Sequence, residues 1–153
     1  MAELKLNAEE IGHYLAEVFP QLFPVEAQGA MAGGGIPAFV IESLSDGEAT
    51  LAFTAAEEHL RPGGTVSGPA LMTLADLAMY VLVLAHIGRQ SLAVTTNLNI
   101  NFLRKPEPGR LLAKARLLKL GRALAVGDVV ISAEAAPGVA VAHATLTYSI
   151  PPK

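Results

Sequence analysis

The chain has 153 residues, a length that fits one domain with a sizeable core. Hydrophobic residues make up 52% and charged residues 16%, which excludes a disordered protein and predicts self-association. The net charge of −3 and the lack of a basic run argue against nucleic acid as a partner. The absence of cysteine excludes disulfides, thiol nucleophiles and thiolate metal sites.

At the N-terminus the sequence predicts a short helix followed by a glycine-rich loop. Asn7 is a suitable N-cap for a helix that runs to about Phe19, and Pro20 and Pro24 end it. Three consecutive glycines lie within residues 32–37, and no regular element holds such a run. Their spacing is not that of a phosphate-binding motif, so we interpret this loop as a connector or a lid.

A β-hairpin is predicted next. The segments Phe39–Leu44 and Glu48–Phe53 flank Ser45-Asp46-Gly47, which is a typical turn sequence. A second loop, residues 57–64, then leads to a long apolar helix, and Gly88 ends that helix.

The long helix, Pro69–Ile87, is 19 residues long and close to the length that spans a bilayer. Asp76 lies near its middle, where a carboxylate costs roughly 3 kcal/mol on insertion scales. The segments on both sides are typical of strands in a soluble domain, so we expect a buried helix and no membrane contact. The first ten residues lack the apolar run of a secretory signal, and a cytoplasmic location is therefore expected.

Strands are predicted for the rest of the chain. Leu92–Leu103 alternates, with Thr96, Leu98, Ile100 and Phe102 on one face and Asn97, Asn99 and Asn101 on the other. Three further strands, Leu111–Leu120, Ala123–Ala135 and Val139–Ile150, have short connections that favour an antiparallel meander. The order of helix, two strands, long helix and four strands predicts an α+β protein with one apolar helix laid across an antiparallel sheet.

Two unlike faces are expected on the long helix, which Ser67 caps and Pro69 opens. The apolar stripe suited to a sheet consists of Ala70, Leu71, Leu74, Ala78, Val81, Leu82 and Ala85. The other side carries Met72, Thr73, Asp76, Met79, Tyr80 and Val83.

Asp76 is the candidate reactive group. It is the only formally charged residue between Arg61 and Arg89, and aspartate is seldom buried without a partner. Such a carboxylate can act as a general base or a nucleophile. The alternative is a structural role, in which Asp76 binds a serine, threonine or arginine, and the residue pattern leaves both open.

Gly68 offers a second element, because a bare backbone N–H at a helix N-terminus can polarise a carbonyl. An ordinary capped helix start is the alternative. Gly68 and Asp76 are eight residues apart, or about 12 Å along a helix. Both would need to lie within about 3 Å of one reacting carbonyl. Two antiparallel copies of the helix can achieve this, so a joint site is predicted at a two-fold interface.

Other catalytic motifs fail on their spacing. Ser67-Gly68 is not part of a G-x-S-x-G motif, because Gly64 lies one residue too far upstream. The four histidines have no metal-ligand spacing, and no metal site or cofactor is expected. His59 is retained as a candidate because it lies in the loop that leads into the helix.

The sequence resembles the hotdog-fold acyl-CoA thioesterases, in particular the phenylacetate-pathway (PaaI-like) branch. The matching stretches are RPGGTVSGPALMTLADLA at 61–78, VTTNLNINFLR at 94–104, the Gly121-Arg122 turn and VAHAT at 141–145. The resemblance covers about residues 38–150 and implies a long central helix wrapped by an antiparallel sheet. It divides the chain into an N-terminal helix and loop, 1–37, and a hotdog domain, 38–153.

The resemblance also implies roles for individual residues. In that family the helix opens with His-Gly-Gly, and an acid follows nine residues after the histidine. Ser67 takes the histidine position, and Asp76 takes that of the acid, which activates water or attacks the thioester. The Gly68 N–H would polarise the carbonyl from the neighbouring chain, while Tyr80 and Arg61 would assist. Substrate would contact Met72, Thr73, Met79 and His59, and CoA phosphates would bind Arg104, Lys105 and Arg122.

Ser67 and Pro69 depart from the family's His-Gly-Gly, because they replace the histidine and the second glycine. This difference leaves a second function open, in which the protein binds acyl-CoA or another apolar ligand without catalysis. A third is dehydration of hydroxyacyl thioesters, because His59-Leu-Arg-Pro-Gly-Gly resembles the His-Phe-Pro-Gly segment of those hotdog enzymes. Those enzymes need an acid fourteen residues after the histidine, and Thr73 occupies that position in this sequence. The leading prediction is acyl-CoA hydrolysis by Asp76 in a homodimer or a dimer of dimers.

Overall fold

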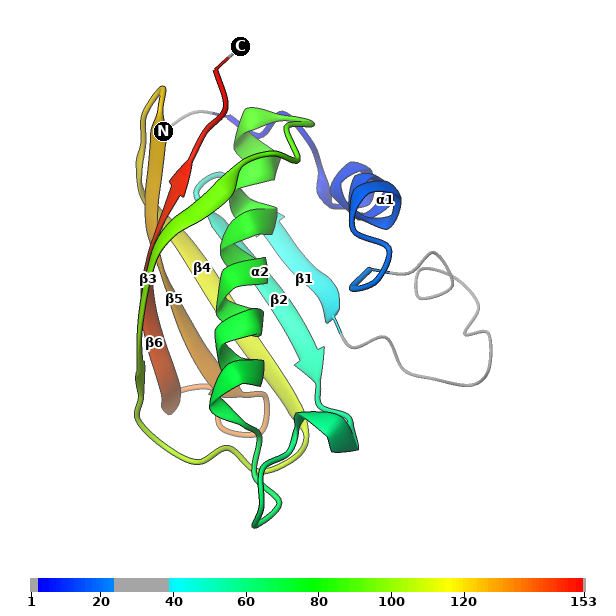
Figure 1. The fold of residues 1–153 in the computed structure, drawn as a ribbon, viewed down its shortest axis with the longest axis vertical. Coiled ribbons are helices and arrows are strands. Elements are labelled where there is room, and N and C mark those ends of the chain that lie inside the picture. Colours follow the sequence, from blue (N-terminus) through cyan, green and yellow to red (C-terminus); the bar gives the residue numbers. More distant parts are fainter. Residues whose placement is uncertain (1–2, 24–38, 153) are drawn as a thin grey trace.

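The computed structural model describes residues 3–23 and 39–152. The elements are α1 (Ala8–Val18), β1 (Phe39–Ser45), β2 (Glu48–Thr54), the 3₁₀ helix η3 (Glu57–His59), α2 (Gly68–Ile87), β3 (Val94–Phe102), β4 (Arg110–Leu120), β5 (Leu124–Ala133) and β6 (Ala140–Ser149). Each predicted helix and strand is present within two residues of its expected ends. The α+β class is confirmed, with α2 laid across one face of a curved antiparallel sheet (Figure 1).

The sheet has six strands in the order β1-β2-β4-β5-β6-β3, and every neighbouring pair is antiparallel. The predicted meander of β4, β5 and β6 is confirmed. The strand β3 precedes that meander in the chain, yet it pairs only with β6, so it forms an edge of the sheet. This position gives β3 one paired side and one side without a partner strand among the described residues.

The ends of α2 follow the predicted capping chemistry. The Ser67 hydroxyl accepts a hydrogen bond from the Ala70 N–H at 3.3 Å, and Pro69 lies in the first turn, where a missing N–H costs little. Gly88 ends the helix with φ of 93°, a conformation that side chains disfavour. By length and composition α2 could cross a membrane, but 78% of its most apolar window is buried inside the protein.

The predicted division of α2 into two faces is wrong in its C-terminal part. Met79 and Val83 were expected on the side away from the sheet, and both are completely buried. The sulfur and methyl groups of Met79 lie against Gly127 of β5, where a Cβ would come within 2.8 Å of them. The helix is apolar all round from Leu77 to Ala85, and such a helix is buried all round rather than on one stripe.

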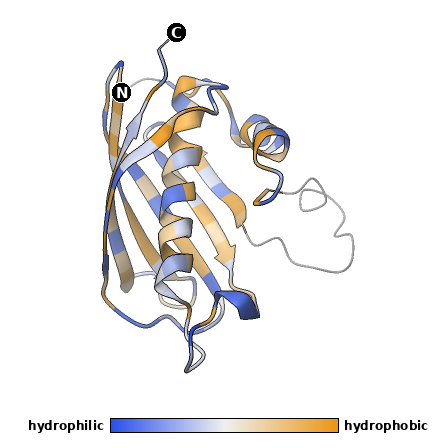
Figure 2. Cartoon of the chain, viewed as in Figure 1, coloured by the Kyte–Doolittle hydropathy of each residue, from blue (hydrophilic) through white to orange (hydrophobic). Residues whose placement is uncertain are grey.

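The helix α1 packs against α2 and β1. Its N-cap forms a capping box between Asn7 and Glu10, and Ile11 and Leu15 are fully buried in the common core. The predicted glycine-rich loop at 32–37 lies outside the described residues. In Figure 2 hydrophobic residues colour much of α2 and the strands facing it, while η3 and the β3–β4 connection are mostly hydrophilic.

A bulge changes the predicted faces of β3. The pairing of β3 with β6 shifts register between Thr95 and Asn97, so Thr96 is the extra residue. As a result Thr95, and not Thr96, points toward α2 together with Leu98. The bulge matters because it directs the Thr95 hydroxyl at the middle of α2.

Candidate active site

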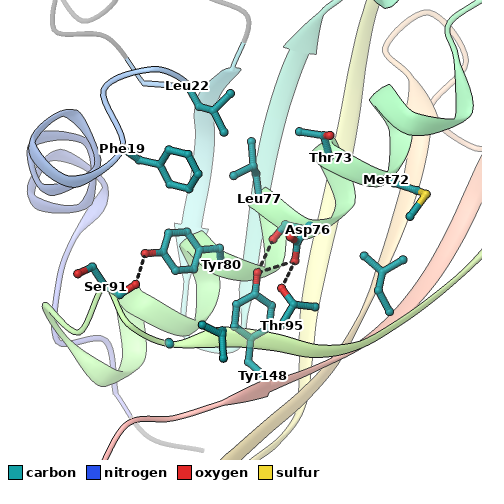
Figure 3. Close-up of a pocket in the computed structure, with 13 residues that line it drawn as sticks. Phe19, Leu22, Met72, Thr73, Asp76, Leu77, Tyr80, Ser91, Thr95 and Tyr148 are labelled. Carbon is teal, nitrogen blue, oxygen red and sulfur yellow. Dashed lines mark hydrogen bonds between the residues drawn. The ribbon is translucent and has the colours of Figure 1, made fainter.

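The carboxylate of Asp76 is held by two hydroxyl groups from neighbouring strands (Figure 3). Thr95 of β3 donates to Oδ1 at 2.6 Å, and Tyr148 of β6 donates to the same oxygen at 2.6 Å. The Tyr148 hydroxyl also lies 3.0 Å from the main-chain carbonyl of Asp76. Thr95 and Tyr148 are directly opposite each other in the β3–β6 register, which places both hydroxyls beside one carboxylate oxygen.

The second carboxylate oxygen, Oδ2, accepts no hydrogen bond from the described residues. Asp76 is half-buried, and no buried side-chain oxygen or nitrogen of the described residues lacks a partner, so Oδ2 is in contact with solvent-accessible space. That space is the cavity that Asp76 lines. The arrangement fixes the carboxylate through Oδ1 and leaves Oδ2 available for a water molecule or a substrate.

The cavity has a volume of about 560 Å³, within the range of small-ligand sites. It is lined from α2 by Met72, Thr73, Asp76, Leu77 and Tyr80, from β3 and the preceding loop by Ser91, Ala93, Val94, Thr95 and Leu98, from β6 by Tyr148, and from the end of α1 by Phe19 and Leu22. Asp76 is the only charged residue among them, and apart from the groups around it the walls are largely aliphatic or aromatic (Figure 3).

Burial raises the pKa of the Tyr148 hydroxyl far above its ordinary value, and the adjacent Asp76 carboxylate raises it further. Tyr148 therefore remains protonated and continues to donate to Asp76 at every pH at which the protein would normally act. A permanent donor at Oδ1 keeps the carboxylate in one orientation.

The raised pKa has a consequence for stability in alkali. In the unfolded chain Tyr148 ionises near its ordinary pKa of about 10, whereas in the folded protein it keeps its proton. Its contribution is therefore complete below about pH 10 and is lost as the pH rises further. We expect Tyr148→Phe to lose less free energy of unfolding between pH 9 and about pH 11 than the native protein, as measured by urea denaturation. Equal losses in the two proteins would contradict this assignment.

Tyr80, one turn beyond Asp76, makes no hydrogen bond to the Asp76 carboxylate in this structure, so its assistance to the acid stays a prediction. Its hydroxyl donates to the Ser91 carbonyl at 2.8 Å, away from Asp76. Its ring stacks on that of Tyr148, with 6.1 Å between the ring centroids, and meets the Phe19 ring edge-on, with 6.2 Å between the centroids. Burial, followed by the proximity of Tyr14, raises the pKa of Tyr80. Tyr80 is thus a wall of the cavity and a support for the Tyr148 ring.

At the start of α2 the Gly68 N–H has no acceptor among the described residues. A Cβ at Gly68 would lie 3.3 Å from the ring of Phe102, the last residue of β3. Ser67 serves as the N-cap, and it lines a separate cavity of about 320 Å³ with His59 and Thr73. Gly68 and Ser67 do not line the cavity of Asp76, so one chain does not bring these predicted residues together.

Only some of the remaining residues predicted to contact or assist the substrate line the Asp76 cavity. Met72 and Thr73 line the cavity beside Asp76, as expected. Met79 does not, because it packs against the sheet at Gly127. Arg61 is exposed in the loop before α2 and lines neither of these cavities.

The three predicted CoA-binding cations do not form one group within a chain. Arg104 and Lys105 follow β3 and lie near the start of α2. The carbonyl of the next residue, Pro106, accepts a hydrogen bond from the Val66 N–H, just before α2 begins. Arg122 lies in the β4–β5 turn and lines a cavity of about 700 Å³ with Ile87, at the opposite end of α2. A single phosphate cannot contact all three in one protomer. Among the residues that the structure describes, no group of three His, Asp or Glu side chains could hold a metal ion.

Sequence reasoning missed the hydroxyl partners of Asp76 and the contribution of α1. Tyr148 was placed in a strand but given no role, and Thr95 was assigned no face. The inward positions of β6 could have indicated Tyr148, since a buried tyrosine needs a partner for its hydroxyl. No local signal indicates that Phe19 and Leu22 reach the cavity, because this depends on how α1 packs on α2.

Comparison with known proteins connects this geometry to a family. A profile of the thioesterase superfamily matches residues 63–147. A protein of Silicibacter sp. TM1040, provisionally described as a thioesterase, is 50% identical over 99% of this chain and 96% of its own, with a TM-score of 0.83. No curated protein matches the chain.

Two other solved structures share the fold and about a quarter of the aligned residues. A mutant of the phenylacetic acid degradation protein PaaI from Thermus thermophilus is 28% identical over 74% of this chain and 94% of its own, with a TM-score of 0.66. The smu.793 protein of Streptococcus mutans, solved with acetyl-CoA bound, is 25% identical over 75% of this chain and 90% of its own, also with a TM-score of 0.66. The chain therefore belongs to the thioesterase superfamily and has the hotdog fold.

Proposed function

We propose that this thioester hydrolase acts on acyl-CoA, with Asp76 as its general base or nucleophile and the Gly68 N–H of a second protomer polarising the thioester carbonyl. The observation that carries this proposal is the environment of Asp76. Two hydroxyls fix Oδ1, while Oδ2 is free in a cavity with apolar walls. A purely structural carboxylate has no need of a cavity beside its free oxygen.

Either route uses the same oxygen. As a general base, Oδ2 takes a proton from a water molecule that attacks the carbonyl carbon; the C–S bond then breaks, and the CoA thiolate regains a proton. As a nucleophile, Oδ2 adds to the carbonyl carbon and expels the thiolate, and water then hydrolyses the mixed anhydride. Thr95 and Tyr148 orient the carboxylate in both routes.

The choice of acyl-CoA is supported by smu.793, which is similar to this chain and was solved with acetyl-CoA bound. Exposed basic residues are present at both ends of α2: Arg104 and Lys105 at one end and Arg122 at the other. In a dimer with antiparallel α2 helices, the first two residues of one chain come close to Arg122 of the other. We propose that these cations bind the phosphates of CoA.

A dimer through β3 would complete the site. The strand β3 carries Thr95, beside Asp76, near one end and Phe102, beside Gly68, at the other. Its free edge, its exposed Val94 and the exposed Leu92 just before the strand favour addition of another strand. If two copies of β3 pair antiparallel, Gly68 of one chain approaches Asp76 of the other, as the distance along α2 requires.

The proposal is tested by measuring release of free CoA thiol from a panel of acyl-CoAs by the purified native protein. We expect release from some of the panel, with a rate proportional to enzyme concentration. If every acyl-CoA binds and none releases thiol, the protein is the non-catalytic binding protein that Ser67 and Pro69 left open. If hydroxyacyl-CoAs are dehydrated and not hydrolysed, the dehydratase interpretation replaces it.

A further inference from the structure

The end of α1 forms one wall of the Asp76 cavity. Phe19, the C-cap of α1, and Leu22 line it, while the other lining residues come from α2, β3 with its preceding loop, and β6. Both residues lie outside positions 63–147, which match the superfamily profile. This wall therefore lies outside the segment that the superfamily profile matches.

A row of aromatic rings connects Asp76 to this wall (Figure 3). Tyr148 donates to the carboxylate, the ring of Tyr80 stacks on Tyr148 at 6.1 Å, and Phe19 meets Tyr80 edge-on at 6.2 Å. An acyl group whose carbonyl lies at Asp76 and whose chain follows this row passes Tyr80, about one helical turn from Asp76, and then meets Phe19, whose ring centroid lies 6.2 Å from that of Tyr80.

The wall is fixed to the rest of the site by hydrogen bonds at Ser91. Tyr14 of α1 accepts the Ser91 N–H at 3.0 Å, and Tyr80 of α2 donates to the Ser91 carbonyl at 2.8 Å. At the other end of α1, the N–H groups of Lys5 and Leu6 both donate to the Ala85 carbonyl. These contacts hold α1 against α2, so Phe19 has a defined position relative to Asp76.

We propose that Phe19 closes the acyl cavity and limits the length of the acyl group, so that the enzyme prefers compact apolar acyl groups, short-chain or aromatic, over long straight chains. This inference rests on the proposed function. Beyond Asp76 the walls near Phe19 offer aromatic faces and the aliphatic Leu22 and Leu77, with no charged group for a polar acyl terminus. Flat and short groups fit beside such rings, whereas a longer chain collides with Phe19.

The test is a comparison of kcat/KM for straight-chain acyl-CoAs from acetyl to palmitoyl and for one aromatic acyl-CoA. We expect Phe19→Ala to raise the ratio of long-chain to short-chain kcat/KM by about tenfold or more. Phe19→Trp, which enlarges the wall, should lower that ratio. Val18→Ala is the matched control, because Val18 is the preceding residue on α1, is 37% exposed and does not line the cavity.

The same series is used to measure dissociation constants, which separates this inference from the proposed function. If the native protein hydrolyses no acyl-CoA, the proposed function fails, and the affinity ratio of long to short chains still tests the wall. If both Phe19 variants remain folded and oligomeric but leave the ratio at its native value, Phe19 does not limit the acyl group. If Val18→Ala shifts the ratio as much as Phe19→Ala, the effect belongs to α1 packing, and the proposal is overturned.

Discussion

Asp76→Asn is expected to lower the rate of thioester hydrolysis by about 10²- to 10⁴-fold. The amide keeps the size of the carboxylate and can still accept hydrogen bonds from Thr95 and Tyr148 through its oxygen. It cannot take a proton from water or attack a carbonyl carbon. The fold should therefore persist while the chemistry is lost, and the measurement is thiol release under single-turnover conditions.

Asp46→Asn is the matched control for this change. Asp46 is exposed in the β1–β2 turn and accepts the Leu4 N–H, a bond that an amide oxygen can also make. Its substitution should leave thiol release near the native rate. A folded, oligomeric Asp76→Asn protein that retains more than about a tenth of the native rate would remove Asp76 from the chemical step, because loss of a general base costs more than this.

Gly68→Pro is expected to reduce kcat by about 10²- to 10³-fold, the usual cost of losing one oxyanion donor. Proline removes the N–H and is tolerated in the first turn of a helix. Because Pro69 follows and disfavours the helical conformation at position 68, circular dichroism must show that the variant keeps its native helix content. Gly68→Ala is its control: it adds a Cβ against the exposed Phe102 ring, which can move, and it keeps the N–H. Equal losses in the two variants would attribute the effect to the Cβ and not to the missing donor.

Mixed dimers test whether Gly68 and Asp76 act across the interface. In a dimer of one Asp76→Asn chain and one Gly68→Pro chain, one site carries both substitutions and the other carries neither. Co-refolding equal amounts of the two inactive proteins should therefore restore about a quarter of the native activity. If the mixture remains inactive although mixed dimers form, the two residues do not share a site between chains.

Local chemistry explains why so much of the fold could be predicted. The ends of both helices depend on side chains and backbone groups only a few residues away in the chain. The structure contains each predicted feature: the N-caps Asn7 and Ser67, Pro69 in the first turn of α2, and Gly88 at its end. The same holds for the hairpin turn at Asp46. The α+β order and the identity of α2 as the central helix follow from these local features and from hydrophobic periodicity.

Contacts between distant segments could not be predicted in the same way. Thr95 reaches Asp76 because β3 pairs with β6 and carries a bulge, and neither fact has a local signature. Tyr148 lies at an inward position of β6, but Asp76, which accepts its hydrogen bond, is 72 residues away in the chain. Met79 was misplaced because its burial depends on the space that Gly127 leaves on β5. Phe19 was missed because its position is set by packing of α1 on α2.

Catalysis by Asp76 across a dimer interface is tested most directly by a crystal structure of the Asp76→Asn protein with an acyl-CoA bound and unhydrolysed. We expect the thioester carbonyl carbon to lie within about 4 Å of the residue 76 side chain, with its oxygen about 3 Å from the Gly68 N–H of the other protomer. The acyl group should extend along Tyr80 toward Phe19. An acyl group bound elsewhere, for example in the cavity beside Arg122, with the Asp76 cavity holding only water, would contradict this expectation.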